Sequence, residues 1–225
     1  MKYEIQGKPY PAATVTLDAN ETIVCQKGGM SWATPNVQMQ TKGGSLGKMF
    51  GRALTGESLF QNEYTAQGGP GLIAFAAAVP GEIMAIELTP GKSIVAQKSS
   101  FLASAPTVTQ ETFFQKKISA GFFGGEGFIM QKFTGTGLLL LEIDGSVITY
   151  DLAAGQSMMI DTGHLAAMEE TCSMSVETVK GIGNALLGGE GLFNTKVSGP
   201  GRIWLQTMPL PKFAGIVARF IPSKN

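Results

Sequence analysis

Short apolar runs rich in β-branched residues alternate with glycine- and proline-bearing turns along the whole chain. Thr14–Leu17 and Thr22–Gln26, for example, flank a turn at Asp18–Asn20. An apolar period of about 3.6 residues nowhere persists over three turns, so the pattern predicts short strands in place of long helices. Only the C-terminal tail is open to two interpretations, a short helix or a strand that Pro222 ends. The predicted fold class is all-β.

Two dipeptides predict hairpins in the middle of the chain. Pro80-Gly81 separates the expected strands Leu72–Val79 and Glu82–Leu88, and proline followed by glycine is typical of a turn. Asp144-Gly145 separates Gly137–Ile143 from Ser146–Leu152 and suits the left-handed conformations of a two-residue hairpin. We expect each pair of strands to lie side by side.

One pattern occurs three times, as GESLFQNEYTAQGGPGLIAF, GGEGFIMQKFTGTGLLL and GGEGLFNTKVSGPGRIWL, beginning at Gly56, Gly124 and Gly188. A second pattern aligns Val15–Pro35 with Ile86–Pro106 and more loosely with Tyr150–Glu170. Self-similarity at a nearly fixed period indicates tandem duplication. The chain is therefore predicted to be a single compact unit of three repeats, about 11–79, 80–143 and 144–220. Each repeat would be a β-sandwich or a double-stranded β-helix, and the three would lie about a pseudo-threefold axis.

Composition changes the expected partners. The 225 residues include 17 basic and 17 acidic side chains, so the net charge is zero and nucleic acid is not expected as a partner. Charged residues make up only 15% of the chain, below the share in ordinary globular domains. Such a surface predicts burial between subunits, and therefore a homo-oligomer, with a trimer as the expected size. No signal peptide or long apolar span is recognisable, which predicts a cytoplasmic protein.

The repeated motif supplies the most distinctive polar residues, Glu57, Glu126 and Glu190. Each carboxylate either accepts hydrogen bonds from the amides of its own turn or joins a ring that holds a cation. Phe122 and Phe123 stand beside glycines in the middle copy. These rings either fill an interface between subunits or form a contact surface for a protein or membrane partner. The spacing of the motifs leaves both pairs of interpretations open.

The histidine and cysteine residues of the chain give little support to a catalytic site or a metal site. His164 is the only histidine, whereas a cupin metal centre needs two or three with a carboxylate. We interpret it as a partly buried ring at the start of a strand. Cys25 and Cys172 belong to no CxxC pair and are expected to be small buried residues. No cofactor, metal ligand or catalytic residue is assigned, and the protein is expected not to be an enzyme.

The GGEG motif, the glycine-bearing strand after it and the V-x-L-x-x-x-E-x-I-V start of the first repeat resemble the family named for altered inheritance of mitochondria. The resemblance covers Thr14 to Phe220. It implies a fold similar to that of the trp RNA-binding attenuation protein, assembly into rings or trimers, and no established enzyme activity. The expected function is a non-enzymatic homo-oligomeric scaffold or ligand- or partner-binding protein. A carboxylate-metal enzyme of cupin-like architecture and an RNA-binding ring are the alternatives.

Overall fold

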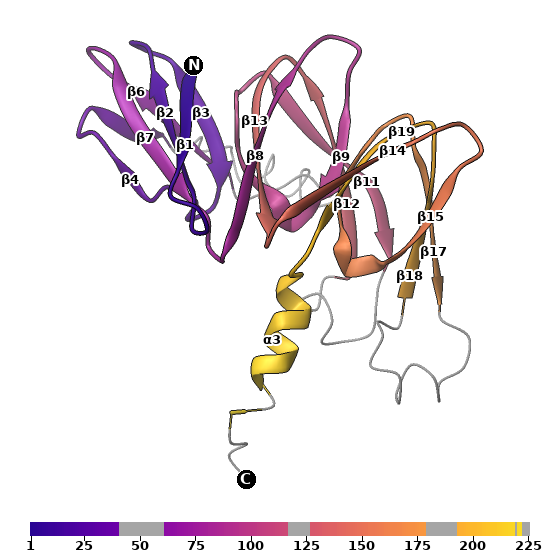
Figure 1. Ribbon diagram of the computed structural model, residues 1–225. Coiled ribbons are helices and arrows are strands. Elements are labelled where there is room, and N and C mark those ends of the chain that lie inside the picture. The colour runs from indigo at the N-terminus through magenta and orange to yellow at the C-terminus, as the bar shows by residue number, and fades with distance from the viewer. Residues whose placement is uncertain (41–60, 117–126, 179–192, 219, 222–225) are drawn as a thin grey trace, which may run out of the picture.

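A computed structural model describes residues 1–40, 61–116, 127–178, 193–218 and 220–221 of the chain (Figure 1). Almost all of the regular structure in these ranges is antiparallel β-sheet, which confirms the all-β prediction. The strands are β1 Lys2–Gln6, β2 Ala12–Leu17, β3 Thr22–Gln26, β4 Trp32–Ala33, β5 Val37–Gln40, β6 Gln61–Ala66, β7 Gly71–Ala76, β8 Gly81–Leu88, β9 Ile94–Gln97, β10 Phe101–Ser104, β11 Val108–Lys116, β12 Phe128–Gly135, β13 Gly137–Asp144, β14 Val147–Leu152, β15 Ser157–Asp161, β16 Leu165–Glu169, β17 Ser173–Thr178, β18 Phe193–Ser198 and β19 Gly201–Gln206.

The strands form four sheets, which we call A to D. Sheet A has the order β1-β2-β7-β4, sheet B β5-β6-β3-β10-β13-β8, sheet C β11-β12-β9-β16-β19-β14, and sheet D β15-β18-β17. Sheets B and C have six strands each, whereas sheets A and D have four and three. Sheets A and D therefore stand at the two ends of the array, and Figure 1 places them at opposite sides of the molecule.

Three buried clusters lie between these sheets. The first joins sheets A and B, the second sheets B and C, and the third sheets C and D. Strand β13 shows why its sequence is an unbroken apolar run: Leu138 and Leu140 belong to the first cluster, and Leu139 and Leu141 to the second. A strand between two cores buries both faces, so its pattern does not alternate.

The pairing order recurs in three consecutive sets of six strands. In β2–β7, the first strand pairs with the sixth, the sixth with the third, the fourth with the fifth, and the fifth with the second. The same four pairings occur in β8–β13 and in β14–β19. Each set is thus a small sandwich of two three-stranded halves, and we refer to the first, second and third sandwich.

Neighbouring sandwiches are joined by strand pairing, and each such pairing is called a joint here. The second strand of one sandwich pairs with the third strand of the next, as β3 with β10 and β9 with β16. Small residues face each other there, Cys25 opposite Ala103 and Ala96 opposite Ala167, and all four are fully buried. The predicted burial of Cys25 and Cys172 is confirmed, and both are free thiols.

The two predicted hairpins are wrong. β7 belongs to sheet A and β8 to sheet B, while β13 belongs to sheet B and β14 to sheet C. The turn at Gly145 is present, with φ of 78°, but its amide donates to Pro80 O and the next amide, of Ser146, donates to Thr207 Oγ1. The local turn therefore matches its sequence pattern, but it carries the chain from one sheet to the next.

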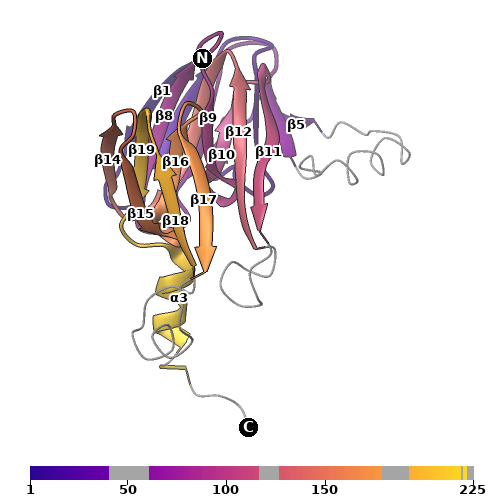
Figure 2. The same cartoon turned by 90° about the vertical axis from the view of Figure 1, so that its right-hand side faces the viewer.

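The C-terminal tail forms helix α3, Leu210–Ala218, which has no buried residue. Figure 2 shows that α3 extends away from the strands. Of the two interpretations of the tail, the helix is therefore the one observed. Among the described residues there is no helix whose length and apolar character would let it cross a bilayer.

Candidate functional site

The strand β9 ends in a buried amide. Gln97 is followed by the short 3-10 helix η1, Lys98–Ser100, and its Nε2 donates to Leu165 O at 2.6 Å and to Gly163 O at 3.2 Å. Gln206 at the end of β19 donates from Nε2 to the same Gly163 O at 2.8 Å, and its Oε1 accepts from Asp144 N at 3.2 Å. These amides satisfy backbone groups where the second and third sandwiches meet.

The end of β13 contributes two carboxylates. Oε1 of Glu142 accepts from the amides of Ala78 at 2.5 Å and Val79 at 3.3 Å, in the link between the first and second sandwiches. Oδ2 of Asp144 accepts from Leu210 N at 2.7 Å, at the start of α3. Residues two apart on a strand face the same side, so both carboxylates lie on one wall.

Burial dominates the electrostatics of this wall. Desolvation raises the pKa of Glu142, the hydrogen bonds from Ala78 and Val79 oppose that rise, and the charge of Asp144 adds to it. Desolvation also raises the pKa of Asp144, against the hydrogen bond from Leu210. Both groups therefore hold their negative charge less easily than exposed carboxylates do.

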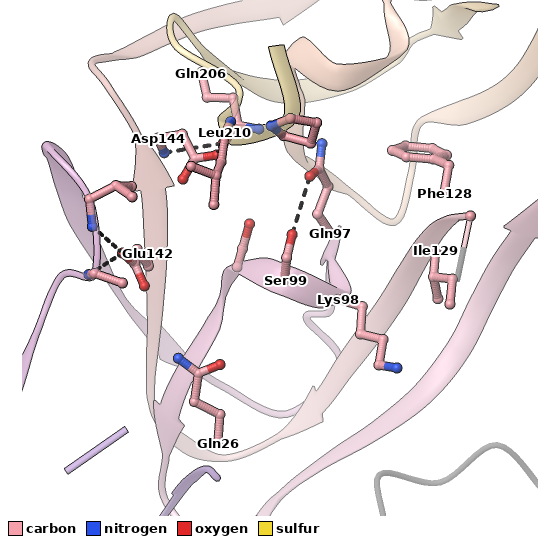
Figure 3. Close-up of a pocket in the computed structure, with 15 residues that line it drawn as sticks. Gln26, Gln97, Lys98, Ser99, Phe128, Ile129, Glu142, Asp144, Gln206 and Leu210 are labelled. Atoms are coloured by element: carbon pink, nitrogen blue, oxygen red, sulfur yellow. Dashed lines mark hydrogen bonds between the residues drawn. The ribbon is translucent and has the colours of Figure 1, made fainter. Parts of the chain in front are cut away.

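A cavity of about 540 Å³ opens against this wall (Figure 3), a size typical of small-molecule sites. Its polar lining includes Gln26, Gln97, Ser99, Glu142 and Asp144. Its apolar lining includes Val79, Phe128, Ile129 and Leu210. Residues from all three sandwiches and from α3 thus meet at one place.

His164 lies in the short 3-10 helix η2, Thr162–His164, directly before β16. Its ring is half-buried, with Nδ1 2.8 Å from Gln206 O and Nε2 3.4 Å from Lys212 Nζ. The same ammonium lies 3.5 Å from Asp161 Oδ2. The ring therefore contacts a backbone carbonyl and a lysine, and Lys212 bridges it to Asp161.

The residues singled out by the repeated motif, Glu57, Glu126, Glu190, Phe122 and Phe123, lie outside the described residues. The described strands show only which strands precede and follow the segments that contain these residues. Residues 41–60, 117–127 and 179–192 each lie between two strands that pair with each other, β5 with β6, β11 with β12 and β17 with β18.

The sequence pattern alone did not reveal this site, although it carries one signal. Glu142 is a single carboxylate inside the apolar run of β13, and a charged residue within a buried strand is unusual. Within the described ranges, no cluster of three or more histidine, cysteine, aspartate or glutamate side chains could hold a metal ion.

The fold and the cavity together define an all-β protein of three joined sandwiches with a pocket where they meet. The chain belongs to the AIM24 family, since the family model described as mitochondrial biogenesis AIM24 matches residues 3–208. This confirms the resemblance inferred from the motifs. The chain is 31% identical over 237 residues to an uncharacterised protein of Streptococcus pyogenes serotype M6, with 100% of this chain and 93% of that protein covered.

A solved structure shows the same fold. The crystal structure of the Streptococcus pyogenes protein SPYM3_0169 is similar to this chain with a TM-score of 0.80 and 28% sequence identity. The similarity covers 98% of this chain and 99% of that one. The fold is therefore shared over nearly the full length of both chains.

Proposed function

We propose that the protein is a non-enzymatic homo-oligomer, built from three tandem copies of one sandwich, that acts as a scaffold and binding protein. The observation that carries this proposal is that two strands, β4 in the first sandwich and β15 in the third, have unpaired edges among the described strands. β4 is the third strand of the first sandwich and β15 the second strand of the third. Their counterparts pair across joints, whereas β4 and β15 each have a free edge among the described strands of the chain.

The side chains on these edges are exposed where their counterparts are buried. Met159 follows the left-handed turn residue Gly155 by four positions, as Val95 follows Gly91, and Met159 is 54% exposed while Val95 is 0% exposed. Trp32 pairs with β7 as Ala103 pairs with β13, and Trp32 is 50% exposed while Ala103 is 0% exposed. Large apolar side chains on an open strand edge favour pairing with another chain.

The register of the internal joints defines the expected contact between copies. By analogy with Cys25 opposite Ala103 and Val24 opposite Ser104, Ile160 of one copy faces Trp32 of the next, and Met159 faces Ala33. An aliphatic residue opposite an aromatic one is a favourable cross-strand pair. Sheets D and A then complete a larger sheet of the kind already seen in sheets B and C.

Such a contact is head-to-tail, so it produces a ring if the rotation closes and a filament if it does not. We propose a closed ring, with the trimer that the family resemblance implies as its size. The cytoplasmic location and the absence of enzyme activity remain parts of this proposal. The RNA-binding and metal-enzyme alternatives are less favoured, because the net charge is zero and the described carboxylates form no metal cluster.

Sedimentation equilibrium of the wild type and of Met159→Lys tests the assembly. We expect the wild type to sediment as a multiple of 23.7 kDa, and Met159→Lys to associate at least about tenfold more weakly, because a lysine would be buried in the joint. Met39→Lys is the matched control, since Met39 is 53% exposed on β5 and lies outside the proposed contact. A wild-type monomer at micromolar concentration contradicts the proposal.

A further inference from the structure

The carboxylates on the cavity wall have unused acceptor atoms. Both hydrogen bonds to Glu142 go to Oε1, and the one hydrogen bond to Asp144 goes to Oδ2. Within the described part of the chain, Oε2 of Glu142 and Oδ1 of Asp144 accept none. Glu142 is only 8% exposed, so water reaches its carboxylate mainly through the cavity.

No cation balances this wall among the described residues. The ion pairs that the described residues form involve other carboxylates, including Glu21, Glu82 and Glu170. Lys98 lines the same cavity, but Figure 3 shows its ammonium on the far side from Glu142 and pointing away from it. One buried carboxylate, Glu142, and one partly buried carboxylate, Asp144, whose described hydrogen bonds come from backbone amides alone, favour a ligand that brings positive charge.

The lining favours an organic cation over a metal ion. Among the described residues, no third carboxylate, histidine or cysteine joins Glu142 and Asp144 in a group that could hold a metal ion. A molecule with one or two ammonium groups on a short carbon chain needs only these two carboxylates as charge partners. Val79, Phe128 and Leu210 supply an apolar wall for the carbon chain, and Gln97 and Ser99 supply polar contacts.

We propose that the cavity binds a small organic amine, with Glu142 and Asp144 as its charge partners. The site shares no lining residue with β4 or β15, the strands of the proposed contact between copies. It is therefore independent of the assembly proposed above. Met159→Lys, which acts on the joint between copies, leaves this site intact.

Isothermal titration calorimetry of the full chain at neutral pH tests the proposal with 1,4-diaminobutane and butylamine as probes. The neutral isostere 1,4-butanediol is the ligand control. Glu142→Gln and Asp144→Asn keep the size and acceptor oxygen of each side chain but remove its charge. Glu87→Gln is the matched protein control, since Glu87 is exposed on β8 and makes the same change in net charge.

We expect saturable binding of at least one amine, no saturable binding of the diol, and affinity at least about tenfold weaker in Glu142→Gln and Asp144→Asn, as for the loss of one charge-assisted hydrogen bond. Glu87→Gln binds as the wild type does. Circular dichroism confirms that each variant is folded. Absence of binding by both amines overturns the proposal, and so does equal affinity of the two cavity variants and the Glu87→Gln control.

Discussion

Glu142 places an ionisable group inside the apolar run of β13, and its burial raises its pKa. The native state therefore binds more protons than the unfolded chain at pH values between the ordinary glutamate pKa of 4.5 and the raised pKa of the folded protein. Because of this difference, the contribution of Glu142 to the free energy of unfolding falls as pH rises through the folded pKa. The charged form of this side chain is therefore less favourable for stability at neutral pH than its protonated form is at lower pH.

Glu142→Gln should remove this part of the pH dependence. The glutamine Oε1 still accepts from Ala78 and Val79, so we expect the variant to be at least as stable as the wild type at neutral pH. The stability difference between the two proteins should shrink as the pH is lowered toward 4.5. Urea unfolding across this range measures it. A variant that is less stable than the wild type at neutral pH contradicts the expected direction.

Helix α3 is the element with the weakest attachment to the fold. It has no buried residue, and Leu210 and Lys212 at its start make its described polar contacts with the body. Deletion of residues 210–225 should therefore change the free energy of unfolding by about 1 kcal/mol or less, the value of one or two partly exposed polar contacts. Deletion from residue 201 onward also removes β19, which pairs with β14 and β16, and should prevent folding.

The same truncation separates stability from binding. Leu210 and Pro211 line the cavity, so a chain that ends at Pro209 keeps the body but loses one wall of the site. We expect it to melt as the full chain does by differential scanning calorimetry and to bind 1,4-diaminobutane more weakly. A truncated chain that fails to fold would show that α3 stabilises the sandwiches through contacts beyond those seen.

Strand positions are more predictable than strand partners. Thr22–Gln26 is expected from the sequence and observed without change, because β-branched residues between turn residues favour an extended chain wherever it is placed. Gly81 and Gly145 mark real changes of direction, but the partners of the strands beside them are far away in sequence. The cavity could not be predicted for the same reason, since Gln97, Glu142 and Leu210 meet only through these long-range pairings.

The whole molecule has two different ends, and this difference allows a complementation test. Met159→Lys blocks the β15 end, and Trp32→Lys blocks the β4 end. Each variant alone should be monomeric, because every contact of a head-to-tail assembly needs one end of each kind. In an equimolar mixture, the intact β15 end of Trp32→Lys can still pair with the intact β4 end of Met159→Lys.

Sedimentation velocity of the mixture should therefore show a dimer of twice 23.7 kDa and nothing larger. Tyr150→Lys serves as a control for the second substitution, because Tyr150 is similarly exposed on β14, away from both ends. Dimers formed by either variant alone would point to an interface made by identical surfaces, and would contradict the head-to-tail contact.

The burial of Cys25 opposite Ala103 makes the first joint accessible to chemical kinetics. Burial raises the pKa of this thiol to about 11, and the reactive thiolate forms only when the joint opens to water. In a Cys172→Ser chain, the rate of alkylation of Cys25 by iodoacetamide therefore reports how often β3 and β10 separate. The pairing of β3 with β10 joins the first and second sandwiches. The alkylation rate therefore measures how often these two sandwiches separate from each other at this joint.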